Sequence, residues 1–187
     1  YKPLPTGDGQ NLSLRLQSSR TFSTYSFSFT EPWFGGRKPK SLSFSIYQSN
    51  QFQINPQTYD VDKDRKLGIT GASIGLGQRL KWPDDFFHLS QTISYQSVQL
   101  KKYGFRVGDN FLNNGTLNNL SYNLNLSRSS AGPSLIFPTY GSEFSFGVKA
   151  TLPYSLIVEK DYTEPANLTA EEQNDFLAEK FKWLEYY

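Results

Sequence analysis

The sequence predicts an all-β protein, and within that class an antiparallel transmembrane β-barrel of which this chain forms a partial wall. Three observations predict it. Apolar and polar residues alternate along about seven segments, the polar side of these segments is almost uncharged, and aromatic residues gather where the segments end. The composition agrees, because 16% aromatic residues, rich in Phe and Tyr, favour strands over helices.

The alternation has the two-residue period of a β-strand, in which successive side chains point to opposite faces. It is clearest at 119–127, where Leu and Tyr at even positions oppose Ser and Asn at odd positions. Gln91 interrupts the apolar side of its segment. The predicted strands are 11–17, 24–30, 41–46, 71–77, 87–95, 119–127 and 143–152. Charged residues collect between them, as at 60–66 and 101–109, which we expect to be connections.

The polar side of these strands distinguishes a barrel wall from a soluble sandwich. On six of the strands, only Arg15, Glu143 and Lys149 are charged among about 25 polar-side positions, whereas about 25–35% of a soluble surface is charged. This side is typical of an uncharged barrel interior, and the apolar side of a lipid-facing band. A soluble secreted β-sandwich for adhesion is the alternative from another class, and it predicts solubility without detergent and a charged polar face.

Lipid-facing residues and interfacial aromatics follow from this assignment. The residues that we expect to face lipid are Leu12, Leu14, Phe27, Phe29, Phe44, Leu120, Leu124, Phe146 and Val148. The aromatic residues at strand ends are Trp33, Phe34, Trp82, Phe86 and Phe87, as in the interfacial girdle of a membrane barrel. The glycines of the 71–77 run are expected to reduce bulk inside the barrel or to let the strand bend.

The connections predict long loops and one helix. The connection at 19–22 is tight, and those at 55–66, 103–115 and 158–181 are long, which suggests the short and long ends of a membrane barrel, with 129–141 as an exception. Thr169 and Glu172 form a capping-box pattern, so a helix is expected over 168–180, within an outer loop. This helix is either a partner-binding element or a small helix folded over its loop. From Phe181 we expect another strand to begin.

The residues for catalysis, metal binding and nucleic-acid binding are missing or isolated. The chain has no Cys and one His, His88, and its net charge of +2 includes no long basic run. Asp60, Asp62 and Asp64 have the spacing of a calcium loop, but Arg65 and Gly71 stand where that loop needs Gly and Glu. We therefore expect no enzyme activity, no metal, no cofactor and no nucleic-acid partner.

Three segments carry a resemblance to a known family. They are PLPTGDGQ at 3–10, SFTEPWFGGRKPK at 28–40 and IFPTYGS at 136–142, and the strand at 143–153 follows the last of them. In this order they resemble turns and strands of the BamA-type barrels of the outer membrane. The residues in these turn motifs are Glu31, Pro32, Trp33, Phe34, Gly35, Phe137, Pro138, Thr139 and Gly141.

The resemblance covers most of the chain, about 3–153, and implies a function. BamA-type proteins have periplasmic POTRA domains and a larger barrel that assembles and inserts outer-membrane proteins. The chain would supply about the third to ninth strands and the start of the tenth, so that 1–187 is part of one barrel domain. The implied partners are outer-membrane lipid, client outer-membrane proteins, accessory lipoproteins, and the rest of the barrel with its POTRA domains. The family's Arg-Gly-Phe loop motif does not occur here. The alternative is another outer-membrane barrel, such as a channel, receptor or translocator.

Overall fold

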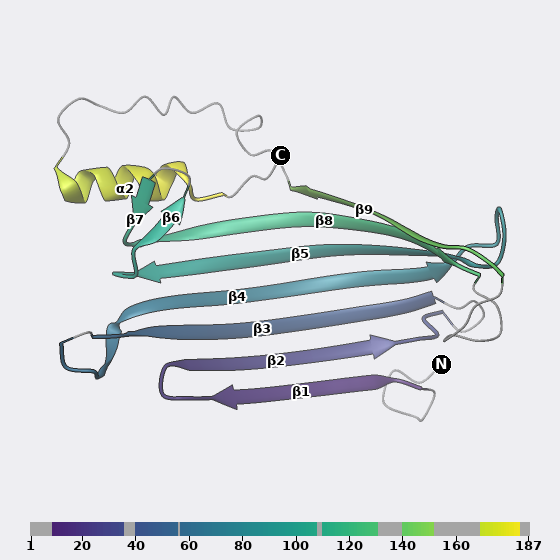
Figure 1. Ribbon diagram of the computed structural model, residues 1–187, viewed down its shortest axis with the longest axis horizontal. Coiled ribbons are helices and arrows are strands. Elements are labelled where there is room, and N and C mark those ends of the chain that lie inside the picture. Colours follow the sequence, from purple (N-terminus) through teal and green to yellow (C-terminus); the bar gives the residue numbers. More distant parts are fainter. Residues whose placement is uncertain are drawn as a thin grey trace.

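The computed structural model describes residues 9–35, 40–55, 57–107, 110–130, 140–151 and 169–183. In this part of the chain, seven strands form one antiparallel sheet in the order β1-β2-β3-β4-β5-β8-β9 (Figure 1). The strands of the sheet are β1 (Asn11–Ser18), β2 (Phe22–Glu31), β3 (Lys40–Ile54), β4 (Val61–Arg79), β5 (Phe87–Lys101), β8 (Gly115–Ser129) and β9 (Glu143–Thr151). A short hairpin of β6 (Phe105–Val107) and β7 (Asn110–Leu112) and the helix α2 (Ala170–Lys180) complete the described structure. The predicted all-β class and the antiparallel sheet are confirmed.

Each strand of the sheet pairs with the sheet strand that precedes it in the chain. Because neighbouring strands run in opposite directions, the connections lie alternately at the two ends of the sheet, on the right and on the left of Figure 1. We call the end with the connections 32–39, 80–86 and 130–142 the turn-motif end, and the end with the connections 19–21, 55–60 and 102–114 the helix end. The helix α2 and the β6–β7 hairpin lie together at the helix end (Figure 1).

The strands extend further towards the helix end than the sequence predicted. Strand β4 has 19 residues and includes 61–66, which were predicted to be a connection. Strands β3, β5 and β8 have 15 residues each, whereas a membrane-spanning strand needs about 9–11. The alternation predicted only the middle of each strand, because the ends beyond an apolar layer need no period-two pattern. A register shift at Phe52/Gln53 marks the irregular part of the β3–β4 pair.

The predicted alternation of loop lengths is wrong. The tight connection at 19–21 lies at the same end of the sheet as the connections 55–60 and 102–114, because all three follow strands that run in the same direction. The connection after β3 is also short, since β4 begins at Val61. Loop length is therefore no guide to which end of this sheet is which.

The predicted helix is present and is capped as expected. The hydroxyl of Thr169 accepts a hydrogen bond from the backbone N–H of Glu172, and the Glu172 carboxylate accepts one from the backbone N–H of Thr169. The strand expected from Phe181 is not seen within the described residues. Instead, Trp183 forms an isolated parallel bridge with Asn118 at the edge of β8, and 184–187 lie outside the described part.

Candidate functional site

One face of the sheet is apolar across all seven strands. The strand register places in neighbouring positions the residues Leu14, Phe27, Ile46, Ala72, Tyr95 and Leu120, and the row beside it has the same character. Within the described part of the chain, many side chains of these two rows are exposed, such as Leu14 at 64% and Ile74 at 56%. A contiguous apolar face of this extent is unusual on a soluble protein and marks a surface that another apolar phase or partner covers.

All nine residues predicted to face lipid lie on this apolar face. The only interruption that the sequence showed, Gln91, is accounted for by its neighbour. The Tyr122 hydroxyl donates a hydrogen bond of 2.8 Å to Gln91 Oε1, and both side chains lie on this face. The polar amide is thus partly satisfied within the apolar band. Contact of these residues with lipid itself stays a prediction.

The apolar band is narrower on β1–β4 than on β5–β9. Strand β2 has three apolar positions between Ser23 and Glu31, and β3 has three between Lys40 and Gln48. Strand β8 has four, from Leu120 to Leu126. Each further apolar position adds about 6–7 Å along the strand. The band therefore becomes taller, by that length, towards β9.

The opposite face is built on a row of hydroxyl groups. The strand register aligns Ser13, Ser28, Ser45, Ser73, Ser94, Ser121 and Thr151, one residue from each of the seven strands. The hydroxyls of Ser45 and Ser73 are 2.7 Å apart, and those of Ser94 and Ser121 are 2.8 Å apart. Hydroxyl pairs across strands satisfy each other without any net charge. This arrangement explains why the polar side of the sequence has so few charged residues.

Glycines on this face make room for larger neighbours. A Cβ at Gly71 would lie 2.5 Å from the ring of Tyr47, and one at Gly75 would lie 2.5 Å from the hydroxyl oxygen of Ser43. Tyr47 is directly opposite Gly71 in the register, so its ring lies over the glycine. The expectation that these glycines reduce bulk on the interior side agrees with these contacts.

The polar face is not polar throughout, which the sequence analysis missed. Near the helix end it becomes apolar, and Leu100 and Leu117 are buried there together with Leu112 and with Leu177 of α2. The Asn174 side chain of α2 also accepts hydrogen bonds from the backbone N–H groups of residues 113 and 114, at 3.0 and 3.2 Å. The helix is therefore held over the interior side of the sheet. The signal was present in the sequence as Leu117 at an odd position of β8 and Leu100 at an even position of β5, but both lay outside the clean alternation.

At the turn-motif end, the apolar face ends at Arg128, which sequence reasoning also missed. Its guanidinium donates to the Asp84 carboxylate at 2.8 and 2.9 Å and lies 5.8 Å from the ring centroids of Phe86 and Phe87. The Arg128 hydrogen bonds hold the pKa of Asp84 below its ordinary value. A cation that is paired with a carboxylate and flanked by aromatic rings is typical of the boundary between lipid and water.

The predicted aromatic girdle lies at this same end. Trp33 and Trp82 belong to two different connections of the turn-motif end, and both are exposed, at 51% and 83%. Phe34, Phe86 and Phe87 lie in or beside the same connections. The shared end was not evident from the sequence, because it depends on the strand directions.

The first turn motif is organised by a buried carboxylate. Glu31 is 4% exposed and accepts hydrogen bonds from the Gln10 amide at 2.5 Å and from the Trp33 backbone N–H at 3.2 Å. Gly35 has a φ of 85°, a conformation that favours glycine. Of the motif at 136–142 the structure describes residues 140–142, and Gly141 has a φ of 107°. Phe137, Pro138 and Thr139 lie outside the described residues, as does the segment 3–8.

The residues weighed for metal binding and catalysis lie apart. Asp60, Asp62 and Asp64 make separate ion pairs with Arg20, Arg65 and Lys101, at 2.9, 3.6 and 3.6 Å. His88 lies at the turn-motif end of β5 on the polar face, opposite Arg79 and Ser127. Among the described residues no group of three or more potential ligands could hold a metal ion. No helix in this part of the chain is long and apolar enough to cross a membrane.

Comparison with known proteins adds the family. The family described as "Omp85 superfamily domain" matches this chain over residues 6–163, which is most of its length. The chain belongs to the Omp85 superfamily. This membership confirms the kinship with POTRA-plus-barrel proteins that the turn motifs predicted, and it makes the sheet part of an outer-membrane β-barrel.

One solved structure resembles this Omp85 chain. It is described as "The crystal structure of BamA from Haemophilus ducreyi lacking POTRA domains 1-3", with 18% sequence identity and a TM-score of 0.46. The match covers 79% of this chain and 29% of that one, so this chain spans less than a third of that protein. No curated protein matches the chain.

Proposed function

We propose that this chain is the stable wall of an outer-membrane barrel that folds and inserts other outer-membrane β-barrel proteins. The observation that carries the proposal is a seven-stranded sheet with one exposed apolar face and one hydroxyl-lined face, in a chain of the Omp85 superfamily. In this proposal the apolar face contacts lipid and the hydroxyl face lines the barrel interior. The chain supplies about the third to ninth strands and the start of the tenth, and the helix over 168–180 belongs to an outer loop.

The sheet edges support a barrel that other strands complete. Within the described residues, one long edge of β1 and one of β9 pair with no further strand. Unpaired backbone groups are costly in lipid, where no water satisfies them. We therefore propose that strands outside the described part pair with both edges. These strands would include a weakly paired seam, where a client protein adds its own strands by β-augmentation.

The changing height of the apolar band supports a second part of the mechanism. The band has three apolar positions on β1–β4 and four or more on β5, β8 and β9. A shorter apolar band thins the adjoining bilayer, because lipid adjusts to the protein surface. In the proposed strand order, β1 is nearer to the seam than β9. Local thinning beside the seam would lower the cost of inserting a client.

Strand pairing and lipid thinning need no nucleotide and no covalent step. The proposed partners are outer-membrane lipid, client outer-membrane proteins and accessory lipoproteins, with the POTRA domains and the remaining strands of the same protein. The proposed location is the bacterial outer membrane, crossed several times by strands. A channel or translocator is the competing function, and the helix α2 over the interior face, packed on Leu117, favours an obstructed interior rather than an open pore.

Reconstitution tests the proposal. The full protein that carries this chain is placed in lipid vesicles, an unfolded small barrel protein is added as client, and its folding is followed by the mobility shift of folded barrels on gels. We expect folding to be faster than in empty vesicles, with no steady leakage of an enclosed dye. If the client folds no faster than in empty vesicles and the dye leaks steadily, the protein is a channel and not an insertase.

A further inference from the structure

We propose that the apolar face contains a binding site for one anionic membrane lipid, with its phosphate held by Lys66 and Lys101 and an acyl chain lying in a hollow beside Ala72. The proposal goes beyond insertase function and rests on the proposed lipid contact of this face. Two hollows on the same face and along the same two strands carry it.

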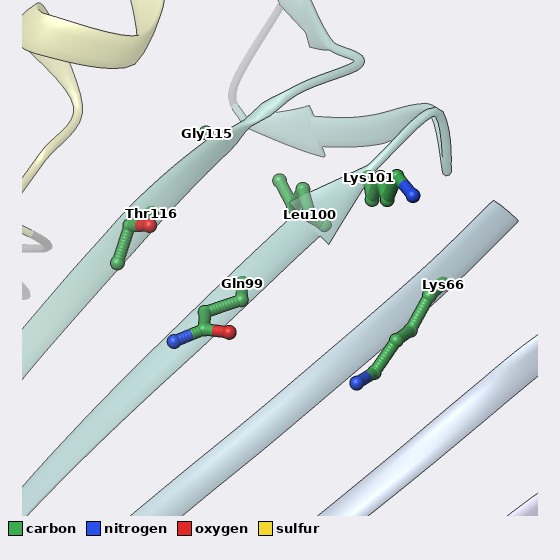
Figure 2. Close-up of a pocket in the computed structure, with 6 residues that line it drawn as sticks. All are labelled: Lys66, Gln99, Leu100, Lys101, Gly115 and Thr116. Atoms are coloured by element: carbon green, nitrogen blue, oxygen red, sulfur yellow. The ribbon is translucent and has the colours of Figure 1, made fainter. Parts of the chain in front are cut away.

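The first hollow is basic. It has a volume of about 270 Å³ and is lined by Lys66, Gln99, Leu100, Lys101, Gly115 and Thr116. Figure 2 shows these residues on three neighbouring strands, β4, β5 and β8. The strand register places Gln99 and Lys101 on the same face as Tyr95 of the apolar band, since they differ by even numbers of residues. The hollow therefore lies beyond the band, towards the helix end, and on β4 it is separated from the band by Thr70 and Gly68.

Lys66 and Lys101 form an unfavourable like-charged pair, and of the two only Lys101 has an acidic partner among the described residues. Lys66 is directly opposite Lys101 in the β4–β5 ladder, and like charges in this position are destabilising. Asp64 pairs with Lys101 at 3.6 Å, but Lys66 makes no ion pair within the described residues. A phosphate near Lys66 would balance the remaining charge and accept charge-assisted hydrogen bonds.

Space for a headgroup comes from a glycine at the floor of this region. Gly68 is buried and lies between Asn50 and Gln99 in the register. The nearest atoms to the position of an added Cβ are Asn50 Oδ1 at 3.4 Å and Lys66 Cε at 3.6 Å. The Lys66 side chain thus runs over Gly68, and amide groups on both sides are available to a polar headgroup.

The second hollow is apolar and begins four residues further along β4. Its volume is about 520 Å³, and its lining includes Leu14, Tyr25, Ile46, Thr70, Ala72 and Tyr95. The small side chain of Ala72 lies between the larger Ile46 and Tyr95 in the register, which explains the depression. From Lys66 to Ala72 the strand covers about 20 Å, at about 3.3 Å per residue. At a strand tilt of about 40° this is about 15 Å along the bilayer normal, which fits within one leaflet of about 20 Å including headgroups.

Charge, spacing and polarity therefore match an anionic lipid whose headgroup carries a phosphate. A phosphate at the lysines would leave its acyl chain beside Ala72, in contact with Tyr25 and Tyr95. A free phosphate would satisfy the lysines but would leave the apolar hollow without a function. A zwitterionic lipid would fill the apolar hollow but bring no net charge to the lysines.

Native mass spectrometry of the full protein in detergent tests the site, with phosphatidylglycerol, chain-matched phosphatidylcholine and inorganic phosphate as probes. We expect the wild-type protein to retain phosphatidylglycerol, and the double variant Lys66→Gln/Lys101→Gln to bind it about tenfold more weakly, as the loss of charge-assisted hydrogen bonds implies. The matched control is Lys63→Gln/Lys102→Gln, which removes two exposed charges at the same end outside the hollow. Equal lipid retention by the two double variants would overturn the proposal.

A variant of the apolar hollow separates lipid from free phosphate. Ala72→Trp fills the hollow without a change in charge, and we expect it to weaken phosphatidylglycerol retention while the gel mobility of the folded barrel stays unchanged. Full retention by Ala72→Trp, with inorganic phosphate bound as tightly as the lipid, would overturn the lipid assignment. Lysine variants that insert into vesicles normally but lose lipid preference would support the site independently of the insertase function.

Discussion

The assignment of the two faces predicts a large difference between neighbouring positions of β8, and Leu124→Arg with Asn123→Arg tests it. Leu124 lies on the apolar face, in register with Gln91 and Val148, whereas Asn123 lies on the hydroxyl face opposite Lys149. The two substitutions introduce the same side chain one residue apart. Any difference between them therefore comes from the face and not from the strand.

The depth of Leu124 in the apolar band gives the expected loss of unfolding free energy. Leu124 is four residues from Arg128, where the apolar face ends. At about 3.3 Å per residue and a strand tilt of about 40°, this places Leu124 about 10 Å above the boundary. Half of an apolar band about 25 Å tall is about 12 Å, so Leu124 lies close to the bilayer midplane, where an arginine costs about 2–4 kcal/mol. Asn123→Arg should cost less than about 1 kcal/mol, mostly through repulsion with Lys149.

Denaturant unfolding of the full protein in lipid vesicles measures both values. The free energy of unfolding is compared for wild type and the two variants, with the mobility shift of the folded barrel on gels as a second readout. Equal losses at the two positions would refute the assignment of faces. A larger loss for Asn123→Arg would reverse it.

Three further predictions concern contacts within the described structure. Gly71→Val should destabilise the protein by about 1–3 kcal/mol through overpacking against the Tyr47 ring. In a double-mutant cycle of unfolding free energies, Tyr47→Ala should recover part of this loss. Purely additive effects of the two substitutions would contradict the contact. Leu177→Ala should weaken the free energy of helix docking by about 2–5 kcal/mol. We expect faster hydrogen exchange in α2, with unchanged exchange in the centre of β3. Unchanged exchange in α2 would show that the helix is not held by this core. Hydrogen bonds from Thr169 keep the pKa of Glu172 below its ordinary value, so its contribution to helix stability is complete above the ordinary glutamate range and is lost as the pH falls through the lowered pKa. The protection of the α2 amides, which is their exchange rate relative to the intrinsic rate at the same pH, should therefore fall at acid pH, and Glu172→Gln should flatten that dependence. An unchanged pH dependence of protection in this variant would show that the capping box is not its cause.

The centres of the strands and their faces were predictable because each depends on neighbouring residues. A side-chain period of two is a property of the strand backbone, so Leu120 and Asn123 could be assigned to opposite faces before any pairing was known. The capping box at Thr169 was predictable for the same reason, since its two residues are three positions apart. The turn motifs likewise pointed to the family from short contiguous segments.

Other features required the pairing of distant segments. The hydroxyl row from Ser13 to Thr151 needs the register of six strand pairs, and the shared end of Trp33 and Trp82 needs the strand directions. The burial of Leu117 beneath α2 depends on a contact between residues 60 positions apart, which no local pattern contains. The like-charged pair of Lys66 and Lys101 is of the same kind. The sequence by itself determined which residues alternate, because that follows from backbone geometry. Only the tertiary structure decided which of them meet, because strand register and helix docking are set by the sum of many long-range contacts.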